Sequence, residues 1–242
     1  MRIAILSDLH GNLEAVKSVL NRIKISDVVD SYIFLGDIID YGPHSNEVVA
    51  TLKLIEKQVL CSIWGNHEHA ILLEDYAHFS SSRGVDCARH TLETLSSETK
   101  KYLNDEMTSA GCREFLIGKK KCLAVHGSLD DCFWNSIKPD VDVSKYSDYD
   151  YVFSGHSHEP HFFEKYTKVD CPEMRNRKKT IFINPGSVGQ PRNLNSCSQY
   201  AILDTETEEV TLRKVVYNVE AEMRGFTDEV DVFYKERIGK GV

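Results

Sequence analysis

The stretch Val59-Leu60-Cys61-Ser62-Ile63-Trp64-Gly65-Asn66-His67-Glu68 decides the fold, because a short apolar run leads directly into a polar turn. The apolar part predicts a buried strand, and Asn66 and His67 follow its carboxyl end. Ligands bind at that end of the strands in open α/β sheets. Because Gly and Asn both tolerate left-handed backbone angles, an ordinary turn is the simpler explanation of the stretch alone. A functional site is indicated only if other strand ends supply matching groups.

Two stretches upstream repeat this pattern. Apolar runs at residues 2–6 and 32–35 lead into two polar turns, Ser7-Asp8-Leu9-His10-Gly11-Asn12 and Gly36-Asp37-Ile38-Ile39-Asp40-Tyr41-Gly42-Pro43. Amphipathic helical patterns follow these turns, at residues 13–23 and about 45–56. Strands and helices that alternate at this spacing predict a parallel βαβαβ unit with right-handed crossovers.

The remainder of the chain predicts further strands and an added helical segment. Residues from about 70 to 104 are polar and helix-permissive, which predicts an insertion of two or three helices over or beside the site. Strands are expected at 113–117, 121–125, 151–153, 181–183, 199–204 and 210–217. Residues 160–179 are expected to form a loop or an irregular hairpin, and residues 218–242 a helix with a loose end. With no repeat, linker or boundary, residues 1–242 are predicted to be a single domain.

Composition limits the class of protein. The 242 residues are 41% hydrophobic and 27% charged, as in ordinary globular proteins that bury a sizeable core. The net charge of -8 argues against a nucleic-acid partner, because such proteins present basic surfaces. Neither a signal peptide nor a membrane-spanning run is visible, so no membrane partner is expected. The 7 scattered cysteines predict free thiols in a reducing cytoplasm.

Metal-type ligands follow one predicted strand after another. They are Asp8, His10, Asp37, Asn66, His67, His126, His156 and His158. Any one of these short motifs is more often a loop feature, but five at strand ends are not coincidence, because parallel strands bring such residues to one edge. Carboxylate, imidazole and amide ligands suit Mn, Fe or Zn. They are too many for one tetrahedral zinc and fit two metals that share a bridging carboxylate.

These motifs resemble, in order, the five motifs of the calcineurin-like metallophosphoesterases. They are Asp8-Leu9-His10, Gly36-Asp37-Ile38-Ile39-Asp40, Gly65-Asn66-His67-Glu68, His126-Gly127 and Gly155-His156-Ser157-His158. Residues 184–189, Asn-Pro-Gly-Ser-Val-Gly, are similar to a further segment of the small bacterial and archaeal phosphodiesterase branch. The resemblance implies an α/β fold, a four-layer α/β/β/α sandwich of two mixed sheets with helices outside.

The resemblance also implies a role for each residue. Two divalent transition-metal ions (Mn, Fe or Zn) would be held by two ligand sets, Asp8, His10 and His158 for the first ion, and Asn66, His126 and His156 for the second, with Asp37 as the bridge. Asn66 and His67 would contact the substrate, and His67 would protonate the leaving oxygen, which suits an imidazole. Asp40 either orients His67 or bonds only within its loop. Glu68 is expected to be a helix N-terminal charge.

The substrate contacts are less defined. Tyr41 stands where protein phosphatases and bacterial diadenosine tetraphosphate hydrolases of this superfamily carry a phosphate-binding arginine, which weakens the protein-phosphatase interpretation. Tyr41 therefore either stacks on a base or aryl group or packs in the core or at the rim. Arg192, the one guanidinium near a motif, either meets a substrate phosphate or forms a surface salt bridge. Specificity is expected in residues 70–104 and in the loops around Trp134 and Tyr166. Of the nearby histidines, His69 is expected to line the pocket, and His78 and His90 to be surface or locally bonded histidines.

The sequence thus predicts a cytoplasmic, dinuclear-metal phosphoesterase that hydrolyses phosphodiesters, of nucleotide type among others, through a metal-bridging hydroxide. Its partner would be a phosphorylated small molecule or nucleotide. The alternatives are a phosphomonoesterase or serine/threonine protein phosphatase, a dinucleoside polyphosphate hydrolase, and a metal-stabilised scaffold with little turnover. The presence of His67 argues against the scaffold, which has no need of a general acid. The identity of the metals and the oligomeric state are left open.

Overall fold

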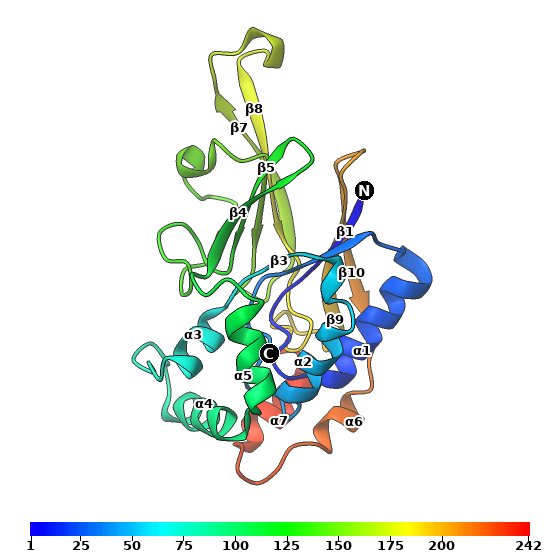
Figure 1. Cartoon of the computed structure of the whole chain (residues 1–242), viewed down its shortest axis with the longest axis vertical. Helices are drawn as coiled ribbons and strands as arrows, with labels where there is room; N and C mark the ends of the chain where they lie inside the picture. Colours follow the sequence, from blue (N-terminus) through cyan, green and yellow to red (C-terminus); the bar gives the residue numbers. More distant parts are fainter.

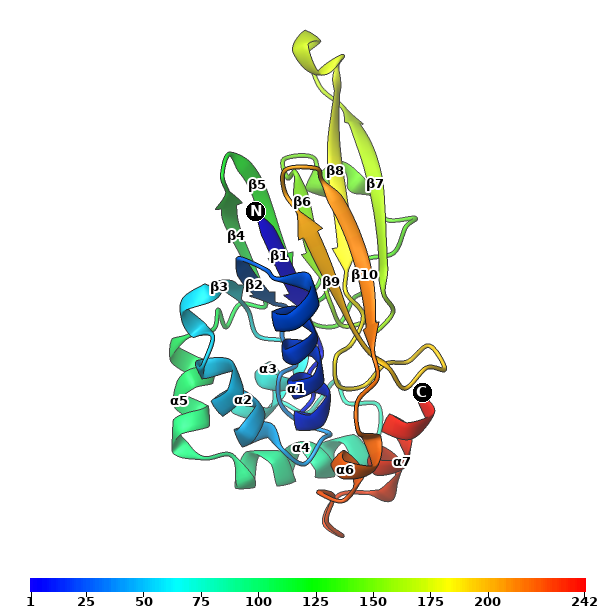
Figure 2. The ribbon, with the colours of Figure 1, turned by 90° about the vertical axis from the view of Figure 1, so that its right-hand side faces the viewer.

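Two five-stranded mixed sheets pack face to face in the computed structural model, which describes residues 1–242 (Figure 2). The first sheet has the order β10-β9-β1-β2-β3, with the bounds β1 (Arg2–Leu6), β2 (Ser31–Phe34), β3 (Val59–Ser62), β9 (Ser198–Asp204) and β10 (Glu209–Val215). The second has the order β4-β5-β6-β8-β7, with the bounds β4 (Cys112–Ile117), β5 (Lys120–Val125), β6 (Tyr151–Ser154), β7 (His161–Lys168) and β8 (Arg177–Asn184).

The first three strands form the predicted parallel unit. Strand β1 pairs in parallel with β2, and β2 pairs in parallel with β3. The first crossover holds α1 (Leu13–Arg22) and the π-helical turn η1 (Ile23–Asp27), and the second holds α2 (Ser45–Lys53) and the 3-10 turn η2 (Glu56–Gln58). The βαβαβ prediction is therefore confirmed, and it brings the carboxyl ends of three strands to one edge.

Side-chain alternation along the strands builds two separate cores. In β1, Ile3 and Ile5 belong to the core between the two sheets, whereas Ala4 and Leu6 belong to the core beneath the helices. Successive residues of a strand point to opposite faces, so one short apolar strand serves both cores. The face-to-face mixed sheets confirm the predicted α/β fold.

Helices cover the first sheet and gather at the end where the strands terminate (Figure 1). Beyond α1 and α2 they are α3 (Asn66–Leu72), α4 (Ser82–Thr94), α5 (Ser97–Asp105), α6 (Val219–Met223) and α7 (Val232–Lys240). The outer face of the second sheet is covered differently. There Ile137 and Tyr146, from a loop with the 3-10 turn η3 (Val143–Tyr146), pack against Val152 and Phe182. This outer layer is a loop where the resemblance implies helices, because Pro139 and closely spaced aspartates favour turns.

Strands β7 and β8 form a long antiparallel hairpin that extends beyond the rest of the molecule (Figure 1). Their register is continuous from His161↔Asn184 to Lys168↔Arg177, and the 3-10 turn η4 (Pro172–Met174) lies at the tip. Of the two alternatives predicted for residues 160–179, a loop or an irregular hairpin, the hairpin is therefore confirmed, but its strands pair regularly. Exposed and half-buried residues alternate along β7, but the charged residues on both faces hide this period in the sequence.

No helix in the chain combines the length and the apolar character that crossing a membrane requires. All 7 cysteines are free, and Cys61 and Cys122 are buried.

Candidate metal centre and its cavity

The predicted ligand residues converge at the carboxyl edge of both sheets. Each follows a strand: Asp8 and His10 after β1, Asp37 after β2, Asn66 and His67 after β3, His126 after β5, and His156 and His158 after β6. All are buried except His156, which is half-buried. Strands that are parallel within each sheet deliver residues from distant parts of the sequence to one place.

Two ligand clusters share one carboxylate. The first contains Asp8, His10, Asp37 and His158, and the second contains Asp37, His126 and His156, with the ligand atoms of each cluster within 4.8 Å of one another. Asp37 Oδ2 lies 3.8 Å from His10 Nε2 and 3.3 Å from His126 Nε2, between the clusters. Two Asp/His clusters with a shared carboxylate are consistent with a dinuclear metal site.

Asn66 adds a neutral oxygen to the second cluster. Its Oδ1 lies 2.9 Å from His126 Nε2 and 3.0 Å from His156 Nδ1. An amide oxygen is not protonated near neutral pH, so it stays available as a ligand atom throughout this range.

Backbone carbonyls orient three of the imidazoles. The Nδ1–H groups of His10, His126 and His158 donate to the carbonyl oxygens of Ile39, Leu35 and Gln190 at 3.3, 2.7 and 2.6 Å. With Nδ1 engaged, the Nε2 lone pair of each ring faces the cluster, which is the usual arrangement of metal-binding histidines.

The electrostatics of the site favour a cation. Both carboxylate oxygens of Asp8 are buried without a hydrogen-bond donor. Burial opposes ionisation of Asp8, but the neighbouring His158 holds the pKa of this carboxyl well below its usual value. Burial lowers the pKa of His10 and His158, and lowers the pKa of His156 to about 4. Burial opposes protonation of His126 too, but the Asp37 carboxylate outweighs it and raises the pKa of His126 to about 9, so this ring would give up its proton when a metal binds. Ionised carboxylates and the imidazoles of His10, His156 and His158 in their neutral form are what a divalent metal binds, so these residues fit the two ions.

The backbone of the ligand turns is strained. Several residues that bear the ligands lie in the left-handed region, with φ of 54° for Asp8, 47° for His10, 51° for Asp37, 62° for His156 and 58° for His158. Such angles disfavour residues with a Cβ and are typical of functional turns. Gly65 is required for a different reason, since a Cβ there would lie 2.1 Å from Asp37 Oδ1.

His67 lies beside the clusters and is held by its own partners. Its backbone N–H donates to Asp37 Oδ1 at 2.8 Å, and its Nδ1–H donates to Asp40 Oδ2 at 2.6 Å. Thr91 Oγ1 donates to the other Asp40 oxygen at 2.7 Å. Burial opposes protonation of His67, but the charges of Asp37 and Asp40 outweigh it and raise the pKa of His67. Asp40 therefore orients this imidazole as well as bonding within its loop, where its N–H donates to Ser45 Oγ. No intramolecular hydrogen bond uses His67 Nε2, so this nitrogen is left for a substrate.

Glu68 does more than the predicted helix-end charge. Its carboxylate accepts the backbone N–H of Gly65 at 2.8 Å and so caps α3. It also accepts the N–H groups of Asp37, Ile38 and Ile39 at 2.8, 2.7 and 3.1 Å. Glu68 therefore fixes the turn that carries the shared carboxylate. In the sequence, Glu68 is marked only by its position next to His67. That position does not distinguish a carboxylate that binds the Asp37 turn from a charge at the end of a helix.

A cavity of about 360 Å³ opens over the clusters. It is lined by Asp37, Tyr41, Asn66, His67, His78, Phe79, Ser80, Trp134, His156, His158, Arg192 and Arg237. His78 stacks on Trp134 with ring centroids 5.1 Å apart. Its ring is exposed, as expected, but it lines the cavity.

His69 does not line this cavity, so that prediction is wrong. It stacks on Phe133 at 4.3 Å. Two residues beyond His67 on the same helix, it points to another side, because residues two apart do not share a helix face. Tyr166 is exposed on the β7–β8 hairpin and is also absent from the cavity wall.

The C-terminal segment contributes to the cavity. The sequence predicted a helix with a loose end at residues 218–242 and gave this segment no part in the site. Tyr234 of α7 stacks on Tyr41 at 4.7 Å, and the Tyr41 ring lies 4.4 Å from that of His67. Packing of Tyr41 between these rings matches the rim-packing alternative. Arg237, on the same helix, lines the cavity with Arg192, so Arg192 is not the one guanidinium near the motifs.

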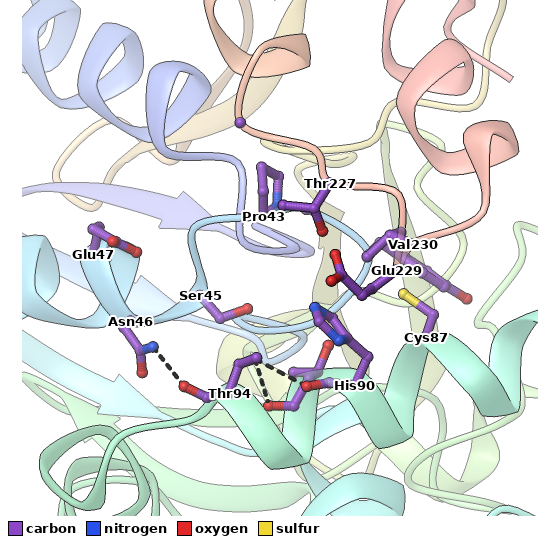
Figure 3. A pocket seen from close by; sticks show the side chains of 14 residues that line it. Pro43, Ser45, Asn46, Glu47, Cys87, His90, Thr94, Thr227, Glu229 and Val230 are labelled. Atoms are coloured by element: carbon purple, nitrogen blue, oxygen red, sulfur yellow. Dashed lines mark hydrogen bonds between the residues drawn. The ribbon is translucent and has the colours of Figure 1, made fainter.

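A second cavity of about 280 Å³ lies beyond Tyr41 (Figure 3). Cys87, His90 and Glu229 project around it, and the dashed line from Asn46 marks its 3.0 Å hydrogen bond to the Thr94 carbonyl. This polar cavity contains none of the ligand residues, so it is separate from the metal centre.

Known proteins are similar to this chain in sequence and in fold. An uncharacterized protein of Methanocaldococcus jannaschii is 31% identical over 222 residues, covering 90% of this chain and 88% of that protein. The crystal structure of a metallophosphoesterase from Sphaerobacter thermophilus superposes with a TM-score of 0.75 at 25% identity and covers 100% of both chains. A phosphodiesterase of Escherichia coli is 24% identical over 208 residues, covering 85% of this chain and 89% of that protein.

The family assignment follows from these likenesses together with the geometry of the clusters. The model of the calcineurin-like phosphoesterase superfamily domain matches residues 1–208. The chain belongs to the calcineurin-like phosphoesterase superfamily, a family of metal-dependent phosphoesterases.

Proposed function

We propose that this protein is a phosphodiesterase that acts on small phosphorylated or nucleotide-type substrates. The observation that carries the proposal is the single carboxylate, Asp37, shared by two buried ligand clusters beside the His67–Asp40 pair. The likeness to a phosphodiesterase of Escherichia coli supports a diester substrate.

The first ion would be held by Asp8, His10 and His158, the second by Asn66, His126 and His156, with Asp37 as bridge. When bound, two divalent ions would act as Lewis acids on phosphoryl oxygens and lower the pKa of a water molecule so that hydroxide forms near neutral pH. Mn, Fe and Zn all suit this set of nitrogen and oxygen ligands.

His67 is proposed as the general acid. Asp40 holds Nδ1 at 2.6 Å, which leaves Nε2 to carry the proton toward the cavity. As the bond between phosphorus and the leaving oxygen breaks, His67 gives that oxygen its proton. Asn66 and His67 would also position the phosphoryl group on the floor of the cavity, because both side chains line it.

The test is hydrolysis by metal-stripped protein reloaded separately with Mn²⁺, Fe²⁺ or Zn²⁺. Reloaded wild type should hydrolyse an aryl phosphodiester and lose that activity on chelation, whereas Asp37→Asn should be slower by at least about 10⁴-fold. Replacing a shared ligand perturbs the binding of both ions. Replacing even a residue that only hydrogen-bonds to a metal ligand typically lowers metal affinity or activity by about 10–100-fold, so a shared ligand should have a larger effect. If wild type is no faster than Asp37→Asn, the catalytic proposal fails.

Running the matching aryl phosphomonoester in parallel separates the diesterase from a phosphomonoesterase or protein phosphatase. A diesterase shows the higher kcat/KM on the diester. The 7 free thiols support the further proposal of a reducing, cytoplasmic location.

A further inference from the structure

Two arginines face the metal cavity without an Asp or Glu partner. Arg192 and Arg237 both line it, and Arg213 is the one arginine of the chain that forms an ion pair. A guanidinium has five N–H donors, yet each of these two uses a single one. Arg192 Nη2 lies 3.4 Å from Gln190 Oε1, and Arg192 Nε is buried without an acceptor. Arg237 Nε donates to the main-chain oxygen of Val242, the last residue of the sequence.

Arg192 is fixed beside the first cluster. It follows Gln190, whose carbonyl oxygen accepts the Nδ1–H of His158 at 2.6 Å. The same segment is fastened at Ser187, whose hydroxyl donates to the Asp8 carbonyl oxygen at 2.7 Å. Arg192 therefore approaches the cavity from the side of the first cluster.

Arg237 approaches from the side of His67. It lies three residues after Tyr234 on α7, and residues three apart share a helix face. The Tyr234–Tyr41 stack at 4.7 Å and the Tyr41–His67 contact at 4.4 Å fix that face over His67. The end of α7 is fastened to the Arg192 segment, because Leu194 N–H donates to the Gly241 carbonyl at 2.8 Å.

The charges of Arg192 and Arg237 are not needed to neutralise the carboxylates of Asp8 and Asp37. Burial and the nearby Arg192 lower the pKa of Arg237 to about 10, so it remains positively charged at neutral pH. Asp8 and Asp37 would be neutralised by divalent ions, so the arginines would make the occupied cavity more positive. Neighbouring cations with free donors are the arrangement that binds phosphate by paired, charge-assisted hydrogen bonds.

We propose that Arg192 and Arg237 bind a second anionic group of the substrate, a phosphate carried by its leaving group. This rests on the proposed function, in which the scissile phosphate would lie at the two ligand clusters and His67 protonates the leaving oxygen. The substrate class is then a phosphodiester or phosphoanhydride with a further phosphate, as in nucleoside polyphosphates. The stacked Trp134 and His78 provide an aromatic wall for the base of such a nucleotide.

The reaction is a simple hydrolysis. The oxygen of water forms a bond to phosphorus and gives up one proton, which replaces the proton that His67 donates, and the bond between phosphorus and the leaving oxygen breaks. His67 supplies the proton of that leaving oxygen, and the departing group keeps the second phosphate against the two arginines. Nothing is oxidised or reduced, and no co-reactant besides water is needed.

The test compares inorganic phosphate with pyrophosphate as competitive inhibitors of aryl phosphodiester hydrolysis, at buffered free Mn²⁺. Wild type should bind pyrophosphate at least 10-fold more tightly than phosphate. Arg237→Met and Arg192→Met, on separate elements, should each reduce this preference by about 10- to 100-fold, as expected for a charged hydrogen bond. Arg237→Lys should fall between, because it keeps the charge but not the planar fork.

Lys240→Met is the matched control, since Lys240 is exposed on the same helix and paired with Glu236 at 2.7 Å. It should leave the preference at the wild-type value, and melting curves should show that every variant is folded. The proposal is overturned if the arginine variants weaken phosphate and pyrophosphate equally, or weaken neither. Calorimetric titration of the Mn²⁺-loaded proteins with phosphate and with methylenediphosphonate, whose P–C–P bridge is not hydrolysed, measures the same preference without turnover. It therefore decides this inference even if the aryl diester is not hydrolysed and the proposed function fails.

Discussion

The two ends of the second sheet differ in almost every respect. At one end, β5 and β6 lead into buried turns that carry His126, His156 and His158, with left-handed backbone at His156 and His158. At the other, β7 and β8 pair without interruption, and side chains such as Tyr166 are exposed. In regularly paired strands the backbone N–H and C=O groups bond to each other and need no particular side chain. At the irregular end, specific side chains must bond to the backbone to hold its conformation. The chemistry therefore lies where the backbone is irregular.

His67→Ala should give the largest effect among variants chosen to test this contrast. We expect a loss of about 10³-fold in kcat with both metals retained, because general acid catalysis contributes about 10²–10⁴-fold. Turnover of an aryl phosphodiester and metal analysis of the same sample measure the two quantities.

The control is His69→Ala on the same helix, whose side chain stacks on Phe133 outside the cavity and should leave kcat near the wild-type value. Loss of both metals from His67→Ala would contradict the role given to His67.

Glu68→Gln should show that the irregular end depends on side chains for its stability. An amide cannot replace a carboxylate that accepts four backbone N–H groups, so the free energy of unfolding should fall by about 2–4 kcal/mol. Urea denaturation of the metal-free protein measures this change without a contribution from metal binding.

Glu98→Gln is its control, because Glu98 lies in the first turn of α5 and is exposed. That variant should stay within about 0.5 kcal/mol of wild type. Equal stability of the two variants would mean that Glu68 does not hold the Asp37 turn.

Tyr166→Ser, at the regular end, should have the smallest effect. The side chain is 58% exposed and does not line the cavity, so kcat/KM on the aryl diester should stay within about twofold of wild type. A larger change would show that the β7–β8 hairpin reaches the substrate and that the contrast between the two ends is wrong.

Sequence patterns predicted the irregular end better than the regular one. Asp8, Asp37 and His126 each follow a buried apolar run. The run predicts a strand, and the ligand-type residue directly after it marks where that strand ends. The β7–β8 hairpin has solvent on both faces over part of its length, so its alternation does not separate apolar from polar residues.

The outer wall of the cavity was also predicted only in part. Trp134 and Arg192 lie close to motifs in the sequence, and the cavity does contain them. Arg237 lies far along the chain in a short amphipathic helix, and only the stacking of Tyr234 on Tyr41 brings it to the site. Contacts of this kind depend on tertiary packing, which leaves no local period in the sequence.

The strained ligand turns have a consequence for the protein in the cell. Left-handed backbone at Asp8, His10 and Asp37 destabilises the metal-free fold. An ion that binds only the folded chain offsets this by an amount that grows with the logarithm of its free concentration above its Kd. Thermal stability is then a joint property of the chain and its metal supply, and metal starvation would reduce the amount of folded protein as well as its activity.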